Sequence, residues 1–461
     1  MTTLTAALAA LALAQASAPA TTTLTLDEAL RRADSANLDL KAARAKLDQA
    51  HAGVQKAWSY HLPQLSAGAT WTHNSDAASI TLPTGYDIRQ YPTLQGHAPG
   101  GTDPWSQTFY AAVPSGLITA DIQVLDQLGA QVQLQVPLIA PPLWYAIQAS
   151  YRAEEVADRT VDNARRELLF GVAQTYYGVT SLKKLLEVSE RLLEMAQRQE
   201  KDAEVRFKAG TIPKVGYLRA EIDRARAEQD VRRSRNALDS ARIALATLLD
   251  RDLAFEVVEP PAPAPAPAGV DLEATALRER RDVQAARANE ALSGSLRSTS
   301  AARYLPSLGA FGQYQVSNVG GFTGKSDSWA VGLALSWKLF DGGLREAELR
   351  EGSARIVEAE ASRRSAEQKA VAEVRQAQLD LESARANAQK SKEQAELAAE
   401  NQRLVDVSFR AGAATAVEQA DATASLRNAL IAATTDELQA QLAALRVLKV
   451  AGIFDPAVAG R

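Results

Sequence analysis

The sequence of 461 residues contains no cysteine and only four histidines. Without cysteine there is no disulfide framework, thiolate metal site, cysteine nucleophile or lipid-modified N-terminal cysteine. The histidines His51, His61, His73 and His97 all lie before residue 100, and none pairs with another at a metal-ligand spacing. A phosphate-binding glycine loop and a nucleophile elbow are also missing. The sequence therefore predicts no enzyme, no cofactor and no metal site.

An excess of charge of one sign is absent as well, since 51 Lys and Arg residues stand against 55 Asp and Glu residues. With no long basic run either, nothing favours nucleic acid as a partner.

Long apolar runs are missing beyond residue 20, which excludes transmembrane helices there. Residues 1–20 form an Ala/Leu-rich apolar stretch that ends in Ala16-Ser17-Ala18 and Ala18-Pro19-Ala20, two small-x-small patterns. These patterns predict a secretory signal peptide, and hence an envelope protein, although no Lys or Arg precedes the apolar stretch. A frayed amphipathic helix is the alternative interpretation.

Proline is absent from two long stretches, the 67 residues 143–209 and the 69 residues 343–411. Both are rich in helix-forming residues, and at about 1.5 Å per residue each predicts a helix of roughly 100 Å. Apolar residues recur three and four positions apart, as in a coiled coil. In the first stretch they are Leu182, Leu185, Leu186, Leu192, Leu193 and Ala196. Taken alone, this feature favours any long coiled coil.

Two short motifs are nearly identical: residues 205–210 read VRFKAG and residues 407–412 read VSFRAG. The similarity extends upstream, because LQVPLIAPPLWYA at 134–146 aligns with LSWKLFDGGLREA at 335–347. Each copy is predicted to run helix, strand, loop, strand, very long helix, tight turn, helix. Two units are too few for a solenoid, so the duplication indicates a pseudo-repeat in an oligomeric or membrane-bound architecture.

The duplication sets the predicted domain boundaries. The first repeat spans 21–258 and the second spans 270–450, with a tail at 451–461. Between the repeats, EPPAPAPAPAG at 259–269 is predicted to be extended polyproline II and to act as a stiff linker. A recognition motif is the alternative role for this segment.

Strand-type alternation is clearest from residue 329 to residue 338. Trp329, Val331, Leu333, Leu335 and Trp337 share one face, and Ala330, Gly332, Ala334, Ser336 and Lys338 share the other. Such a strand is typical of a transmembrane β-barrel with aromatic residues at both interfaces. The two tryptophans are separated by about 26 Å along a strand, or about 20 Å along the membrane normal at a tilt of about 40°. A strand of a soluble sandwich is the alternative.

The remaining predicted strands are less regular. Gln131–Val136 alternates without a fault and Leu65–Thr72 nearly so, whereas Leu308–Val316 places Phe311 on the wrong face. The segment between the strands of the first copy, residues 72–127, is rich in Pro, Gly, Ser, Thr and aromatic residues. It is predicted to be a long extracellular loop, because long loops face outside in membrane barrels.

Together these features resemble the TolC-like outer-membrane efflux proteins, the outer membrane factors, over essentially the whole mature chain. The resemblance rests on LTLDEALRRADSANLDLKAARAKL at residues 24–47 and on the Leu-Pro pairs at 62–63 and 305–306. It also rests on PLIAPPL and KLFDGGL after the second strands, and on FKAGTIP and FRAGAAT at the helix turns.

The resemblance implies a mainly α fold with transmembrane β structure. Each protomer of a homotrimer would give four strands to one twelve-stranded β-barrel, which continues into a periplasmic α-helical barrel. Oligomerisation is also required on physical grounds, since four strands cannot close a barrel and an open edge cannot lie in lipid.

The implied function is a passive exit duct of a tripartite efflux or type I secretion system, located in the outer membrane and extending into the periplasm. Its implied partners are outer-membrane lipid, a periplasmic adaptor (membrane fusion) protein and an inner-membrane pump. A periplasmic structural coiled coil without a pore is the alternative. An adaptor protein is a second alternative, but adaptors lack the duplicated strand-helix unit.

The resemblance also assigns roles to residues. Trp329 and Trp337 would be membrane-interface aromatics, and Glu418 and Asp421 would line a pore constriction at which a trimer displays six carboxylates. The tip that contacts the adaptor would consist of Gly210, Thr211, Ile212, Pro213, Gly412, Ala413, Ala414 and Thr415. Ordinary helix C-caps and a solvated acidic face are the alternatives. Some relatives latch this tip with an Arg and an Asp; the aligned residues are Ala414 and Gly216, so closure would rest mainly on helix packing.

Overall fold

The structure is a computed structural model that describes residues 22–92, 108–267, 269–320 and 323–454. The predicted signal peptide, residues 93–107 of the predicted loop and most of the predicted tail lie outside the described residues. The chain divides into two compact units. Residues 54–149 and 295–352 form one, here called the sheet unit, and the remainder forms the other, the helical unit.

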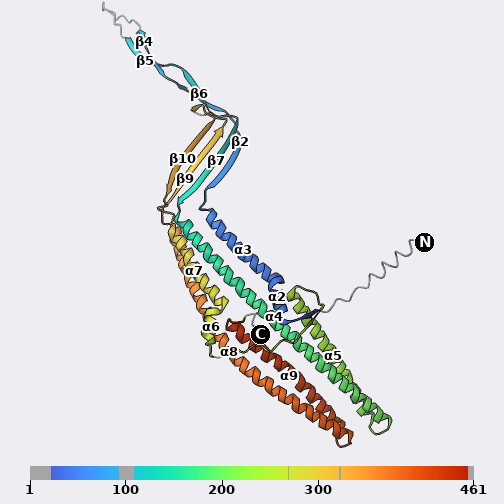
Figure 1. Ribbon diagram of the computed structural model, residues 1–461. Helices are drawn as coiled ribbons and strands as arrows, with labels where there is room; N and C mark the ends of the chain where they lie inside the picture. Colours follow the sequence, from blue (N-terminus) through green and yellow to red (C-terminus); the bar gives the residue numbers. More distant parts are fainter. Residues whose placement is uncertain (1–21, 93–107, 268, 321–322, 455–461) are drawn as a thin grey trace, which may run out of the picture. The chain divides into compact units, whose positions relative to one another are not determined.

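The duplication predicted from the sequence is confirmed by the order and length of the elements (Figure 1). The first copy consists of α2 (Leu26–Ala36), α3 (Leu38–Ser59), β2 (Gln64–His73), β7 (Asp126–Ile139), α4 (Pro141–Lys208) and α5 (Lys214–Leu249). The second consists of α6 (Leu272–Glu279), α7 (Arg281–Ala302), β9 (Ser307–Ser317), β10 (Asp327–Ser336), α8 (Leu344–Arg410) and α9 (Ala416–Val450). The long helices α4 and α8 contain 68 and 67 residues, in agreement with the proline-free stretches.

The strands of the two copies form one antiparallel sheet in the order β10-β9-β7-β2. The copies meet at its centre, where β7 pairs with β9. Each copy contributes one outer strand, β2 or β10, and within the described residues neither outer strand has a second partner. The sheet therefore presents two open edges.

The segment between β2 and β7, which the sequence predicts to be a long extracellular loop, contains four short strands. It contains β3 (Ala78–Pro83) paired with β6 (Leu117–Gln123), and β4 (Tyr86–Pro92) paired with β5 (Thr108–Pro114). Prolines end several of these strands, and between the two ladders Gly116 has a φ of 98°, a conformation that favours glycine. The prolines and glycines that suggested a loop therefore separate short antiparallel ladders.

The core of the helical unit surrounds a small parallel pair of strands, β1 (Thr22–Leu24) and β8 (Phe255–Val257). The buried Tyr176 of α4 places its hydroxyl 2.7 Å from the carbonyl oxygen of Leu24 and 2.6 Å from that of Val258. Burial raises the pKa of the Tyr176 phenol to about 12, so the hydroxyl is a neutral donor at physiological pH. Tyr176 thus connects α4 to β1 and to Val258, the residue that follows β8.

Residues 258–267, which include most of the predicted Pro/Ala linker, have no helix or strand and contact the helices. Tyr177 donates a hydrogen bond to the carbonyl oxygen of Pro261 at 2.8 Å, and Lys184 lies 2.7 Å from the carboxylate of Glu259. Further along, Ala266 packs against a second buried apolar cluster of the helical unit, which includes Val374 and Ala377. The linker therefore follows the surface of the helical unit.

Within the part of the chain that the structure describes, no helix carries an apolar stretch of the length that a membrane crossing requires.

Candidate functional site

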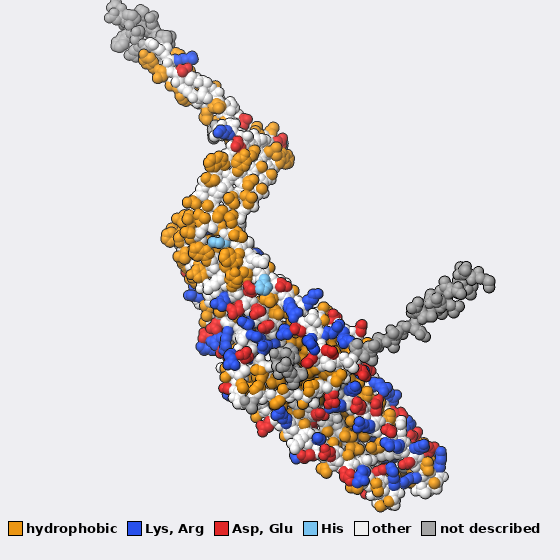
Figure 2. All heavy atoms as spheres, in the orientation of Figure 1, with side chains coloured by type: hydrophobic (Ala, Val, Ile, Leu, Met, Phe, Trp, Pro, Cys, Tyr) orange, Lys and Arg blue, Asp and Glu red, His pale blue; other side chains and the backbone are white. Residues whose placement is uncertain are grey.

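One face of the sheet β10-β9-β7-β2, here called the apolar face, carries large apolar side chains on every strand. The register places Trp329 opposite Tyr314, Leu333 opposite Ala310, and Leu65 opposite Leu134. The side chains are widely exposed in the single chain, with Trp329 at 72%, Leu333 at 68% and Trp337 at 59%. Hydrophobic side chains spread over this sheet in Figure 2, whereas charged side chains gather over the helices.

The members of the apolar face follow from the register. They are Leu65, Ala67, Ala69, Trp71, Leu128, Ala130, Val132, Leu134, Val136, Leu308, Ala310, Gly312, Tyr314, Val316, Trp329, Val331, Leu333 and Leu335. Polar residues begin where this set ends: beyond Trp71, His73 lies 2.9 Å from Asp126. Near the other end, the indole nitrogen of Trp337 donates to the carbonyl oxygen of Tyr304 at 3.1 Å. The apolar band thus has a polar boundary at one end and an anchored tryptophan near the other.

The opposite face, here called the amide face, is polar but uncharged within the strands, since β10 ends at Ser336 and Lys338, predicted to share this face, lies beyond it. Its members are Gln64, Ser66, Gly68, Thr70, Gly129, Gln131, Gln133, Gln135, Gly309, Phe311, Gln313, Gln315, Ser328, Ala330, Gly332, Ala334 and Ser336. Gln131 pairs with Gln315 and Gln133 with Gln313 across the strands, and Gln313 donates to Gln315 at 3.2 Å. A sheet with one apolar and one hydrated face, alternating residue by residue, fits a wall between lipid and water.

Phe311 is the residue that broke the predicted alternation, and the structure places it on the amide face. Its partner in the register is Gly332, and a Cβ atom at Gly332 would lie 2.9 Å from Cζ of the Phe311 ring. The ring therefore occupies the space that a side chain at residue 332 would take. The irregular position is accommodated by a glycine on the neighbouring strand, which the pattern of a single strand cannot reveal.

The first helix turn joins α4 to α5 through residues 209–213. Gly210 adopts a φ of 74°, and the amide of Thr211 donates to the carbonyl oxygen of Arg206 at 2.9 Å. The Thr211 hydroxyl donates to the same carbonyl at 2.9 Å. Pro213 is the N-cap of α5 and provides no side-chain cap. Gly210 is required here because a left-handed residue closes the helix.

The second turn, residues 411–415, repeats this backbone. Gly412 has a φ of 78°, and the amide of Ala413 donates to the carbonyl oxygen of Ser408 at 2.8 Å. Both turns are helix C-caps of the kind given as an alternative, and both lie on the surface: Gly210, Thr211, Pro213, Gly412, Ala413 and Thr415 are exposed, whereas Ile212 and Ala414 are half-buried.

The second turn differs from the first in its N-cap. Thr415 and Glu418 form a capping box, in which Glu418 accepts from the Thr415 amide at 2.7 Å and from its hydroxyl at 2.9 Å. The hydrogen bond from the Thr415 amide has the larger effect and that from the Thr415 hydroxyl the next, and both lower the pKa of the Glu418 carboxyl. Sequence reasoning missed this role, although Thr-x-x-Glu before a helix is the signature of a capping box.

Asp421, the second residue of the predicted constriction, lies one turn further along α9 and is exposed. Both carboxylates therefore reach solvent in the single chain, but that of Glu418 is already held by its own helix. At the positions aligned with a latch, Ala414 and Gly216 offer no polar side chain.

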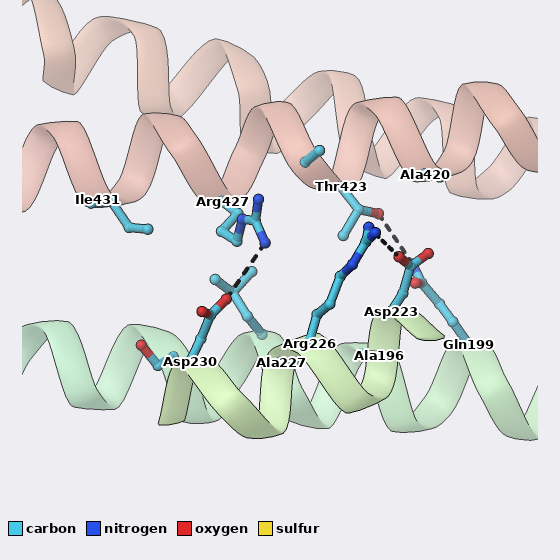
Figure 3. Close-up of a pocket in the computed structure, with 13 residues that line it drawn as sticks. Ala196, Gln199, Asp223, Arg226, Ala227, Asp230, Ala420, Thr423, Arg427 and Ile431 are labelled. Atoms are coloured by element: carbon cyan, nitrogen blue, oxygen red, sulfur yellow. Dashed lines mark hydrogen bonds and ion pairs between the residues drawn. The ribbon is translucent and has the colours of Figure 1, made fainter. Parts of the chain in front are cut away.

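The two hairpins contact each other instead through other residues. The guanidinium of Arg206, at the end of α4, lies 4.8 Å from the ring centroid of Phe409, at the end of α8. A cleft of about 100 Å³ lies where α4 and α5 face α9. Figure 3 shows the residues that line it. Its charged side chains form the ion pairs Asp230–Arg427 at 3.5 Å and Asp223–Arg226 at 3.7 Å. Asp230–Arg427 joins α5 to α9, whereas Asp223–Arg226 lies within α5, so one ion pair links the two hairpins across the cleft.

The described residues contain no group of three or more His, Cys, Asp or Glu side chains that could hold a metal ion.

A duplicated strand-helix chain with one apolar and one hydrated sheet face defines an envelope protein of the channel-forming class. The model of the outer membrane efflux protein family matches residues 29–251 and 272–452, and the chain belongs to this family. It is accordingly an outer-membrane protein that extends into the periplasm, and its family is one of efflux channels.

Individual relatives are distant. The cobalt-zinc-cadmium resistance protein CzcC of Cupriavidus metallidurans is 24% identical over 225 residues, which are 49% of this chain and 42% of CzcC. The match thus spans less than half the length of that relative.

Among solved structures, CusC has a TM-score of 0.74 and 16% identity, covering 93% of this chain and 92% of CusC. The outer membrane protein VceC of Vibrio cholerae has a TM-score of 0.70 and 18% identity, with 93% and 96% covered. At these identities the structures show that the fold is shared.

Proposed function

We propose that the protein is the exit duct of a tripartite efflux or type I secretion system, a homotrimer whose sheets close into a twelve-stranded barrel. The observation that carries this proposal is the four-stranded sheet with one apolar face, one amide face and two open edges. In lipid, unpaired strand edges cost several kcal/mol per unsatisfied backbone group, so β2 and β10 need partners. Joining β10 of one protomer to β2 of the next satisfies both edges, and conduction through such a pore needs no chemistry.

Within this proposal the apolar face contacts lipid, and Trp329 and Trp337 lie at the two interfaces. The residues 1–20 act as the secretory signal, and the strands β3 to β6 form the extracellular extension of the first repeat. The turns at 209–213 and 411–415 face a periplasmic adaptor, which links the duct to an inner-membrane pump.

The turns provide the test of the adaptor contact. Ala413 is exposed and makes no side-chain hydrogen bond, so Ala413→Trp adds bulk without removing a cap. We expect export to be lost while trimer yield stays at the wild-type level. Thr211→Trp should act in the same way but should also lower stability by about 1 kcal/mol, because its hydroxyl caps Arg206. Full export by both variants would contradict the proposed tip.

We further propose that Glu418 and Asp421 form a carboxylate ring that favours cations, because three protomers would bring six carboxylates to one level. The similarity to CzcC favours divalent metal cations as cargo. The cations would be concentrated by charge, since the described residues offer no metal-binding cluster. A solvated acidic helix face remains the alternative role of these residues.

The ring is tested by planar-bilayer recordings of the purified trimer. The double variant Glu418→Gln, Asp421→Asn removes the charges, and Gln keeps the capping box that Ala would break. We expect the wild-type pore to prefer cations and to be blocked by trivalent cations, and both properties to weaken in the double variant. Unchanged selectivity and block would assign the two residues to a solvated face. Cells that lack the protein should become more sensitive to cobalt, zinc and cadmium if those are the cargo.

A further inference from the structure

The two copies of the repeat use one strand register. In the first copy Leu65 of β2 lies opposite Leu134 of β7, and in the second Leu308 of β9 lies opposite Leu335 of β10. These residues occupy the same places in the aligned copies, and all ten residue pairs of one ladder have an equivalent in the other. The alignment of the copies therefore holds residue by residue in the sheet.

The junction between the copies has no counterpart within the single chain. It joins the second strand of one copy, β7, to the first strand of the next, β9. The equivalent junction would join β10 to β2, but these strands are the two open edges of the sheet. Four strands cannot close on themselves, so β10 can meet only the β2 of another protomer.

The ends of β7 and β10 show what the open edge lacks. β7 has 14 residues and pairs with β9 at its last residue, Ile139, whereas β10 has 10 residues and ends before the aligned residues Leu339 and Phe340. Leu339 is 73% exposed and Phe340 85%, against 45% for Leu138 and 46% for Ile139. Residues 337–340 therefore lack the neighbour that β9 gives to β7.

The segment after β10 is nevertheless held in place. Arg345 and Asp341 form an ion pair at 2.8 Å, with side chains only 7% and 9% exposed. Arg345 also donates to the carbonyl oxygen of Leu339 at 3.1 Å. The backbone is thus fixed while the side chains of Leu339 and Phe340 stay exposed.

Resting on the proposed function, we propose that β10 pairs with β2 of the partner subunit in the register that β7 has with β9. In the described sheet Leu134 lies opposite Gly312. The equivalent residues are Leu335 and Ala69, so Leu335 lies opposite Ala69 of the partner subunit.

The same equivalence gives the other contacts of this joint. Trp337 lies opposite Ala67 of the partner subunit, which leaves room for the indole, and Phe340 lies opposite Leu65 of the partner subunit, which covers the exposed ring. Apolar faces meet apolar faces throughout, whereas a slip by one residue would set them against the amide face.

The test exploits the absence of cysteine from the chain. A Cβ atom at Gly312 would lie 3.9 Å from that of Leu134, which suits a disulfide. Leu335→Cys, Ala69→Cys is the equivalent pair across the joint. We expect oxidation of this full-length variant in phospholipid vesicles to give covalent trimers in denaturing electrophoresis. Leu134→Cys, Gly312→Cys is the matched control and should lose its free thiols without linking protomers.

Two slipped pairs test the register, Leu335→Cys with Ala67→Cys and Leu335→Cys with Trp71→Cys. They should cross-link roughly tenfold more slowly, because diagonal neighbours are about 7 to 8 Å apart, beyond the usual reach of a disulfide. Fastest cross-linking of a slipped pair would overturn the register. Trimers in which the control closes but no pair links protomers would overturn the pairing of β10 with β2. A wild-type protein that stays monomeric in vesicles would overturn the proposed function itself.

Phe340→Ala tests the cover of the exposed ring without any cross-link. Because a large buried side chain is lost in each protomer, we expect the yield of folded trimer to fall by roughly tenfold or more. Ile88→Ala is the matched control, since Ile88 is 75% exposed and belongs to β4, outside the four-stranded sheet. Equal yields from the two variants would overturn the contact of Phe340 with the partner subunit.

Discussion

Arginine at residue 333 or 334 tests which face of β10 contacts lipid. Leu333 lies four residues from Trp329 and four from Trp337, about 13 Å along the strand from each, which is the middle of the apolar band. An arginine near the midplane of a lipid-facing strand costs about 2 to 4 kcal/mol, so Leu333→Arg should destabilise a trimer by about 6 to 12 kcal/mol in total. Ala334 is the next residue and belongs to the amide face, where an arginine reaches water.

The assay compares the yield of folded trimer and the denaturant midpoint of both variants in phospholipid vesicles. We expect Leu333→Arg to lose most of the folded trimer, whereas Ala334→Arg keeps the wild-type yield and changes the conductance. The two substitutions add the same side chain to adjacent residues of one strand, so differences in expression or net charge cannot explain a difference between them. Equal losses of folded trimer would refute the assignment of the two faces.

Two further predictions concern the helical unit. Tyr176→Phe removes the hydroxyl that lies between the carbonyl oxygens of Leu24 and Val258, so the free energy of unfolding should fall by about 1 kcal/mol in a denaturant titration. Asp34→Asn should lower stability by about 1 kcal/mol at pH 7, because Arg165 donates to both Asp34 oxygens, at 2.7 Å and 2.6 Å. The Arg165 hydrogen bond lowers the folded-state pKa of Asp34, so its contribution is present above the ordinary carboxyl pKa and is lost as pH falls through the folded value. The variant and the wild type should therefore converge in stability at low pH; a gap that persists would rule out this ion pair as the cause.

The repeat and the faces of β10 could be predicted from the sequence because both depend on local pattern. Proline-free stretches fix the long helices, and strict alternation from Trp329 to Trp337 fixes the two faces. Phe311 could not be understood in this way, because its position depends on Gly332, a residue of another strand that only the register identifies.

Two features that the prediction missed, the strands within residues 72–127 and the capping box at Thr415, do have local signals in the sequence. In residues 72–127 the prolines and glycines suggested one loop, although the short runs between them are β-branched and aromatic enough for strands. At the second turn, Glu418 was assigned to a pore, although Thr415 three residues earlier indicated a capping box. The contacts of the Tyr176 hydroxyl could not be predicted from local sequence, since Leu24 and Val258 are distant from Tyr176 along the chain.

The two helix hairpins, α4–α5 and α8–α9, have similar turns but different side chains near them. In the first hairpin Phe207 stacks on Tyr217, with ring centroids 5.9 Å apart, and no side chain caps α5. In the second, Asp406 accepts from Gln419 at 2.9 Å and pairs with Arg410 at 2.7 Å, and a capping box begins α9.

Both turns share the glycine and the backbone hydrogen bond that closes the long helix, because the reversal of the chain depends on backbone geometry alone. The side chains can differ because the reversal does not depend on them. In the proposed trimer, six hairpins of similar backbone would therefore carry two different sets of side chains. A periplasmic partner that contacts all six could then be positioned in only three equivalent orientations, although the backbone approaches six-fold symmetry.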